Sequence, residues 1–242
     1  MNASTIGRLG ALAGLMWAGT ASAQSSVMPA EYAVPQQRMR LFAPPRPRTA
    51  PVPLDGLPAN LRDQIAKVVR DPTLCAHGPA EEFPGSTYDW LLDHPDRVAT
   101  AWRRLGVPCV GITNKGDGQF TWSDGQGSDV AWVTAYQSPT MRIWYAEGQA
   151  KAATSLPVIP VKAVAVVRHS RRADESGQVL ITHEVDVYLQ TDSKAAALVT
   201  RLLGPAAPRM AEQGATQLLM FFSAMAKHLE EHPDQVPTLL RR

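Results

Sequence analysis

The stretch from Val179 to Gln190 constrains the fold more than any other part of the chain, because apolar and polar residues alternate along it. Such alternation is typical of a β-strand with one buried face. The apolar face carries Val179, Ile181, Val185, Val187 and Leu189. His183 lies in the middle of this face, where a neutral imidazole needs a hydrogen-bond partner. The sequence therefore predicts either a core histidine satisfied by a polar neighbour or a contact to a ligand.

Helices are predicted on both sides of a run of strands. Helical spacing and capping residues predict helices over 57–70, 88–92, 96–105, 193–203 and 208–232, with a break between 203 and 208. Alternation and turn residues predict strands over 107–113, 119–123, 129–136, 141–147, 158–168 and 179–190, the last two joined by a hairpin loop at 170–177. This order predicts an α+β fold in which one antiparallel sheet of roughly five to seven strands wraps around a long C-terminal helix.

The first residues have the three parts of a secretory signal peptide. Arg8 is the only charged residue before Glu31, an apolar stretch runs from Leu9 to Gly19, and Ala21-Ser22-Ala23 matches the cleavage pattern. We therefore expect residues 1–23 to be removed and the protein to be exported, either to the periplasm or to the medium. No transmembrane anchor is expected after cleavage.

Three further segments are predicted after the signal peptide. Residues 24–58 are rich in proline and predict a disordered linker. Residues 59–233 are expected to form a single domain, and residues 234–242 a C-terminal tail. The formal net charge is only +2 and the arginines are dispersed, which disfavours nucleic acid as a partner.

Two cysteines, Cys75 and Cys109, are the candidates for a disulfide in an oxidising compartment. The closed loop of about 35 residues would stabilise the fold by about 3–4 kcal/mol. Two separate buried thiols are the alternative.

The segment from His228 to His232 matches the H-x-x-E-H pattern of inverted zinc peptidases. Those enzymes take a third ligand far downstream, and the segment lies in the last helical turn before Pro233, so we expect no metal site here. The chain contains no G-x-S-x-G motif, and its glycine-rich turns do not lead from a strand into a helix. The sequence therefore predicts no nucleophile, no phosphate cradle and no cofactor.

The order of elements over residues 57–232 resembles the START-related, or SRPBCC, helix-grip superfamily, which includes the birch-pollen-allergen-like lipid-binding proteins. Three short stretches have the look of family signatures, namely Trp122-Ser123-Asp124-Gly125, Trp144-Tyr145-Ala146-Glu147-Gly148 and Thr191-Asp192-Ser193-Lys194. The resemblance implies a cavity for a hydrophobic or amphipathic molecule between the sheet and the C-terminal helix. Members include carriers, sensors, cyclases and hydrolases, so the fold alone does not select a function.

The candidate cavity residues come from the predicted strands and from the last helix. They are His183, Ala165, Arg142, Trp144, Trp132, Tyr136, Gln213, Gln217, Phe221 and Met225. We expect Trp132 and Tyr136 to share one face of the sheet, as Arg142 and Trp144 do. Arg142 must be paired if its face is covered. The register of the last hairpin leaves His183 opposite Ala165, Val167 or His169.

Three hypotheses for the function follow. The preferred one is non-catalytic binding of a hydrophobic or amphipathic small molecule, with lipids as candidates. The second is an enzyme of the same superfamily that uses His183 with Arg142 or a carboxylate as acid and base. The third is a structural or partner-binding envelope protein whose core is packed shut.

Overall fold

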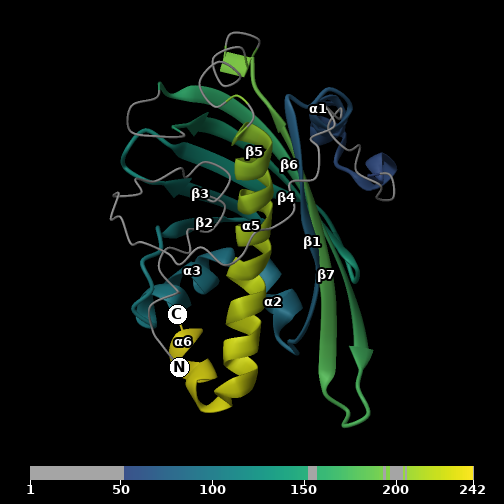
Figure 1. The fold of residues 1–242 in the computed structure, drawn as a ribbon, viewed down its shortest axis with the longest axis vertical. Helices are drawn as coiled ribbons and strands as arrows, with labels where there is room; N and C mark the ends of the chain where they lie inside the picture. Colours follow the sequence, from purple (N-terminus) through teal and green to yellow (C-terminus); the bar gives the residue numbers. More distant parts are fainter. Residues whose placement is uncertain (1–51, 152–156, 193–194, 197–203, 205, 242) are drawn as a thin grey trace, which may run out of the picture.

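The computed structural model describes residues 52–151, 157–192, 195–196, 204 and 206–241. Seven strands form one sheet in the order β1-β7-β6-β5-β4-β3-β2, and every neighbouring pair is antiparallel (Figure 1). The strands are β1 Leu74–Pro84, β2 Ile112–Gly116, β3 Gln119–Ser123, β4 Asp129–Ser138, β5 Met141–Ala150, β6 Ile159–Ala173 and β7 Val179–Gln190. Strands β2 to β7 follow one another as a meander, and β1 pairs with β7 at the edge.

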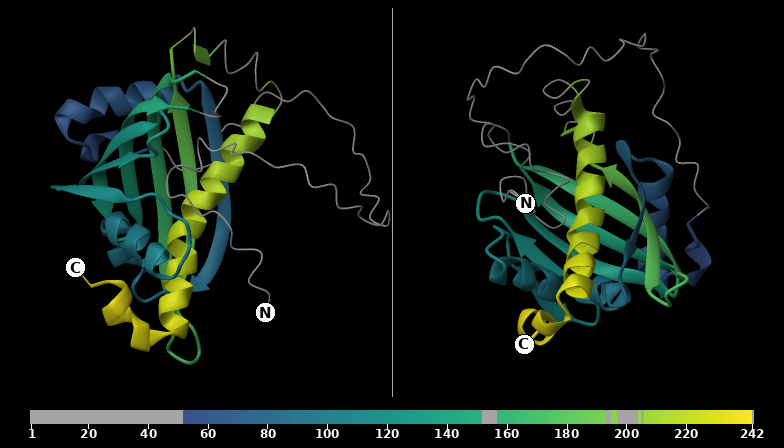
Figure 2. Two further views of the ribbon diagram at one scale, coloured as in Figure 1. Left: turned by 90° about the vertical axis from the view of Figure 1, so that its left-hand side faces the viewer. Right: turned by 60° about the horizontal axis from the view of Figure 1, so that its bottom comes forward.

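A long C-terminal helix, α5 (Ala206–Glu231), crosses one face of this sheet (Figures 1 and 2). Its buried residues recur every three or four positions, because one stripe of a helix can face a sheet. The buried apolar stripe consists of Ala211, Gly214, Ala215, Leu218, Leu219, Phe221, Phe222, Met225, Ala226 and Leu229. Helices α2 (Tyr88–Asp93) and α3 (Pro95–Arg104) pack beside α5 on the same side. The predicted α+β helix-grip fold is therefore confirmed.

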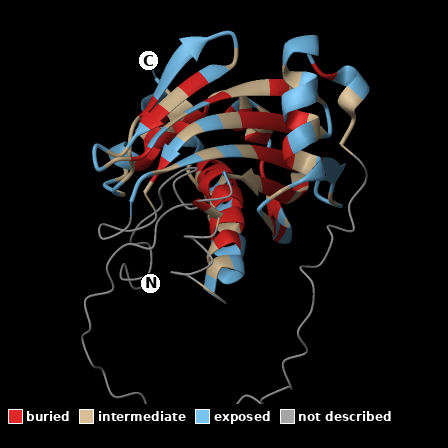
Figure 3. Ribbon diagram, turned by 90° about the horizontal axis from the view of Figure 1, so that it is seen from above, coloured by how far each residue is buried: buried red, intermediate tan, exposed pale blue. Residues whose placement is uncertain are grey.

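The sheet separates two apolar clusters. The inner cluster lies between the sheet, α5, α2 and α3, and it contains Phe83, Trp144 and Phe221. The outer cluster lies on the other face, where α1 (Ala59–Arg70) covers residues such as Ile143 and Val166. Figure 3 shows the buried residues of the sheet and α5 facing each other.

The register places His183 of β7 opposite His169 of β6 and opposite Glu81 of β1. This settles the open register in favour of His169. A β-bulge between Thr134 and Tyr136 shifts the alternation of β4. Trp132 therefore belongs to the inner cluster, whereas Tyr136 packs against the outer one. Our expectation that these two residues share a face is wrong, because an inserted residue reverses the side to which the next residues point.

The strand β1 is missing from the sequence-based prediction. Its residues 78–82 read Gly-Pro-Ala-Glu-Glu, and the bulge between Gly78 and Glu81 removes the alternation by which strands are recognised. The predicted strand over 107–113 is instead a shorter strand that begins at Ile112. Of the predicted break, Gly204 is a turn residue with a positive φ of 47°, whereas Pro205 and most of the predicted helix over 193–203 lie outside the described residues.

The folded part extends beyond both predicted ends of the domain. A 3-10 helix, η2 (Leu54–Gly56), precedes α1, and Leu57 is buried in the outer cluster. After α5 come the 3-10 helix η3 (Pro233–Gln235) and α6 (Val236–Leu239), whose Leu239 is buried in the inner cluster. Single apolar residues within polar or proline-rich stretches anchor both ends, and periodicity does not detect them.

Candidate functional site

A polar cluster lies on the inner face of the sheet around His183. Helix α2 brings the Tyr88 hydroxyl to 2.6 Å from His183 Nδ1. The other ring nitrogen, Nε2, lies 3.8 Å from Glu81 Oε2 on β1. The side chains of Tyr88 and His183 are fully or almost fully buried, and the Phe83 ring contacts both edge-on. His183 thus has the polar neighbour that a core histidine requires.

Glu81 connects this cluster to α5. Its carboxylate forms an ion pair with Lys227 and accepts a hydrogen bond of 3.3 Å from Ser223 Oγ. The Lys227 ammonium also lies 5.7 Å from the centroid of the Phe83 ring. The chain of contacts therefore runs from α2 through β7 and β1 to α5.

Burial determines the protonation states of this cluster. Burial, opposed in part by the nearby Glu81 carboxylate, lowers the pKa of His183 to about 4. Burial likewise lowers the pKa of His169, and burial together with Asp89 raises the pKa of the Tyr88 hydroxyl well above its usual value. Burial would raise the pKa of Glu81, but Lys227 outweighs it and leaves this pKa below its ordinary value. At neutral pH the site holds neutral imidazoles, a neutral phenol and one carboxylate.

A second group of charges closes the end of the inner core next to α2. His169 Nδ1 lies 3.5 Å from Asp89 Oδ1, and Arg171 donates to the other oxygen of Asp89 at 2.6 Å. Arg142, which is 4% exposed, donates from Nε to Asp93 at 3.0 Å. The prediction that a covered Arg142 must be paired is confirmed.

Two tryptophans of the inner face have no hydrogen-bond partner for their indole N–H groups within the described ranges. They are Trp122 on β3 and Trp144 on β5, and both are buried in the inner cluster. The Trp144 ring stacks on Phe222 of α5 with the centroids 5.6 Å apart. The buried imidazoles of His169 and His183, by comparison, each have a carboxylate oxygen within 4 Å of one ring nitrogen.

The structure brings most of the predicted cavity residues to the inner core. Ala165 lies beside Trp144 on the neighbouring strand, and Phe221 and Met225 are buried on α5. Gln217 is half-buried, whereas Gln213 is exposed. Whether these residues line a ligand cavity stays a prediction.

Other sequence motifs have different outcomes. The thiols of Cys75 and Cys109 are free, and they lie on opposite faces of the sheet, Cys75 against the outer cluster and Cys109 against the inner one. The structure therefore has two separate thiols, the alternative to a disulfide, and both are only partly buried. The rings of His228 and His232 contact each other at 4.5 Å, and His228 contacts Gln235. No group of three potential metal ligands occurs in the part of the chain that the structure describes.

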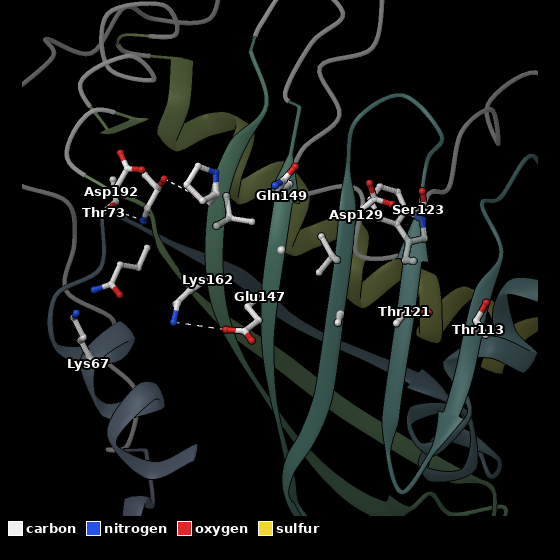
Figure 4. Close-up of a pocket in the computed structure, with 18 of the residues that line it drawn as sticks. Lys67, Thr73, Thr113, Thr121, Ser123, Asp129, Glu147, Gln149, Lys162 and Asp192 are labelled. Carbon is white, nitrogen blue, oxygen red and sulfur yellow. Dashed lines mark hydrogen bonds and ion pairs between the residues drawn. The ribbon is translucent and has the colours of Figure 1, made fainter. Parts of the chain in front are cut away.

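Sequence reasoning missed a polar groove on the outer face of the sheet. It has a volume of about 1180 Å³ and lies beside the C-terminal end of α1, with Lys67 on that helix and Thr121, Glu147 and Lys162 on the strands (Figure 4). The residues that line it come from α1 and from strands that are distant from that helix in the sequence, so no local sequence pattern identifies the groove. Tyr88 and Glu81 were also missed as partners of His183, because α2 and β1 are distant from β7 in the sequence.

No protein-family model and no curated protein matches the chain. Among solved structures, a conserved protein from Geobacillus kaustophilus is similar, at 15% identity and a TM-score of 0.36, over 66% of this chain and 97% of that one. A hypothetical protein from Helicobacter pylori is 12% identical with a TM-score of 0.39, over 78% of this chain and 99% of that one. The di-domain ARO/CYC StfQ from the steffimycin biosynthetic pathway is 9% identical with a TM-score of 0.35, over 71% of this chain and 56% of that one. Similarity at this level assigns no function to the chain.

Among the helices in the described ranges, α5 included, none combines the length and the apolar character needed to cross a bilayer.

Proposed function

We propose that this protein binds an amphipathic small molecule between the inner face of the sheet and α5. The observation that carries the proposal is the pair of buried indole N–H groups of Trp122 and Trp144, which have no acceptor among the described residues. A buried donor without a partner costs about 1–3 kcal/mol. A ligand that offers an oxygen to these donors and an apolar body to Phe222 would recover that cost.

The surroundings of the two tryptophans favour a molecule that is mostly apolar. Phe120 and Trp132 stack on the same face at 5.4 Å between centroids, and α5 contributes phenylalanine, leucine and methionine side chains to the same inner cluster. Methionine side chains adapt to the shape of a bound molecule. Lipid-like compounds with one or two oxygen acceptors have this combination of properties.

Native mass spectrometry of the full-length protein, purified from its own host, tests the proposal. We expect a bound small molecule in the wild type and at least a fivefold lower occupancy in Trp144→Phe, which removes the N–H but keeps an aromatic ring. Trp90→Phe is the matched control, because Trp90 is 38% exposed and stacks on His94 away from the inner core. Ala165→Leu, next to Trp144, is a second variant that should lower the occupancy by filling space.

Two results would overturn this function. One is a wild-type protein without any bound molecule under conditions that preserve its fold. The other is equal occupancy in Trp144→Phe, Ala165→Leu and Trp90→Phe, each verified as folded by circular dichroism.

An enzyme is the second candidate, and the contact chain Tyr88–His183–Glu81 favours it. A phenol, an imidazole and a carboxylate in series can move a proton between a buried and a half-exposed position. The low pKa of His183 weakens this reading, because a general base works best when its pKa is near the operating pH. A variant His183→Gln that still binds the co-purified molecule, but no longer converts it, would favour the enzyme over the carrier.

Export and family membership belong to the same proposal. We infer an exported member of the START-related superfamily, supported by the signal-like N-terminus and by the helix-grip arrangement. N-terminal sequencing of protein from the extracytoplasmic fraction should begin at Gln24. Recovery of intact Met1 from the cytosol alone would contradict export.

A further inference from the structure

The outer face of the sheet is only partly covered. Helix α1 and η2 pack over the outer cluster, and the groove lies beyond the C-terminal end of α1 on the same face. The sheet separates this groove from α5, which lies behind it in Figure 4. The groove therefore opens on the face opposite to the ligand proposed for the inner face, and Trp122 is the residue that the two sites have in common.

Acidic side chains outnumber basic ones in this groove. Its lining contains Asp71, Asp129, Glu147 and Asp192 against Lys67 and Lys162. Lys162 lies 3.6 Å from Glu147, which also accepts a hydrogen bond of 3.1 Å from Tyr145. The exposed carboxylates of Asp71 and Asp129 have no hydrogen bond or ion pair within the described ranges, so they remain available to a cation.

The chain itself supplies a basic segment next to this face. Residues 24–51 contain four arginines, at positions 38, 40, 46 and 48, and a single acidic residue, Glu31. The described chain begins at Val52, which packs against the outer cluster, so the segment leaves the fold on the face that bears the groove.

Length and composition also suit this placement. In the polyproline conformation, at about 3.1 Å per residue, the segment reaches roughly 85 Å. A domain of this size is roughly 35–40 Å across, so the segment can reach any point on the outer face. Its prolines at positions 29, 35, 44, 45, 47 and 51 reduce the entropy lost when it is held in an extended form.

We propose that residues 24–51 dock into the outer groove of their own chain, with their arginines bound by the carboxylates of Asp71 and Asp129. Guanidinium groups bind carboxylates in a bidentate manner, and this suits two exposed carboxylates that have no partner in the part of the chain that the structure describes. Attachment at Val52 keeps the segment at a high effective concentration, so individually weak ion pairs suffice. The docked segment covers the polar outer surface, and any external basic peptide must displace it.

Site-specific photo-cross-linking in the full mature chain tests this proposal. Phe42 is replaced by p-benzoylphenylalanine, and the cross-linked peptides are mapped by mass spectrometry. We expect cross-links to the outer residues of β3 to β6 and to the end of α1, independent of protein concentration. Their yield should fall about tenfold between 50 and 500 mM NaCl, because the contacts are exposed ion pairs.

Charge variants supply the matched controls. Asp71→Asn with Asp129→Asn should lower the cross-link yield at least fivefold. Glu231→Gln with Asp234→Asn removes the same charge from the exposed region at the end of α5 and should leave the yield unchanged. Cross-links outside the groove, cross-links between chains only, or equal yields in the two double variants would each overturn the proposal. None of these results bears on occupancy of the inner face.

Discussion

The environment of His183 illustrates how one side chain holds several elements together. Its Nδ1 is hydrogen-bonded to the Tyr88 hydroxyl, its ring contacts the Phe83 ring, and its Nε2 faces the Glu81 carboxylate. Histidine therefore links β7 to α2 and to the edge strand β1 at a point where the sheet is otherwise apolar. A purely apolar side chain at this position would leave the Tyr88 hydroxyl buried without a partner.

Tyr88→Phe isolates the bond between Tyr88 and His183. We expect the free energy of unfolding to fall by about 1–3 kcal/mol, because the substitution strands a buried imidazole nitrogen. Tyr136→Phe is the control, since no hydrogen bond to its hydroxyl occurs among the described residues. Urea denaturation measures both variants, and an equal effect in the two would show that the bond contributes nothing.

The protonation of His183 predicts how stability depends on pH. Its pKa is about 4 in the folded protein and about 6.5 in the unfolded chain. Between these values the unfolded state binds more protons, so stability falls as the pH drops from about 6.5 towards 4. The largest loss is about 3 kcal/mol by linkage.

The variant His183→Asn should lose the part of this pH dependence that comes from the titration of His183. His169, whose pKa is also lowered, contributes in the same direction and stays in the variant, so the difference between the two unfolding profiles reports His183. Glu81, whose pKa lies below its ordinary value, is likewise unchanged in the variant. Parallel profiles from pH 7 to 4.5 would contradict the assignment.

At the scale of elements, regular segments could be predicted from the sequence and irregular ones could not. Strand β7 and helix α5 lie close to their predicted ranges. Apolar residues recur at a constant spacing along the whole of each element, at every second position in β7 and at every third or fourth position in α5. Strand β1 was missed, since a bulge and Pro79 interrupt its alternation. The bulge in β4 misplaced Tyr136 for the same reason. Local period is visible in a sequence, whereas an inserted residue is defined only by the partner strand.

The close approach of α5 to β1 depends on Gly78. A Cβ atom at this position would lie 2.8 Å from Leu219 Cδ1, 2.8 Å from Val185 Cγ1 and 3.1 Å from the carbonyl oxygen of Ala215. We expect Gly78→Ala to lower the free energy of unfolding by about 1–3 kcal/mol through overpacking. Gly111→Ala is the matched control, because its nearest neighbour, at 3.3 Å, is the flexible end of Arg103. Thermal unfolding that shifts equally in both variants would contradict this contact.

At the scale of the molecule, the sheet serves two separate surfaces. The inner surface could be anticipated from the apolar face of β7 and from the position of α5. The outer groove could not, because it lies beside the end of α1 and is lined by strands that are distant from this helix in the sequence. The same reason hid Glu81 and Tyr88, whose proximity to His183 arises from the pairing of the first strand with the last. Contacts between the two ends of the chain therefore define both surfaces.

The two ends of the fold give the last prediction. Leu57 is 3% exposed in the outer cluster and Leu239 is 4% exposed in the inner cluster, although the sequence places them in a linker and a tail. Truncation of a buried leucine to alanine costs about 2–5 kcal/mol, so Leu57→Ala and Leu239→Ala should each destabilise the protein by at least 2 kcal/mol. Val158→Ala, at a side chain that is 41% exposed, should change stability by less than about 0.5 kcal/mol. Guanidinium denaturation of the three variants decides whether the domain extends past residues 59 and 233, since an unchanged midpoint in a leucine variant would place that end outside the cooperative fold.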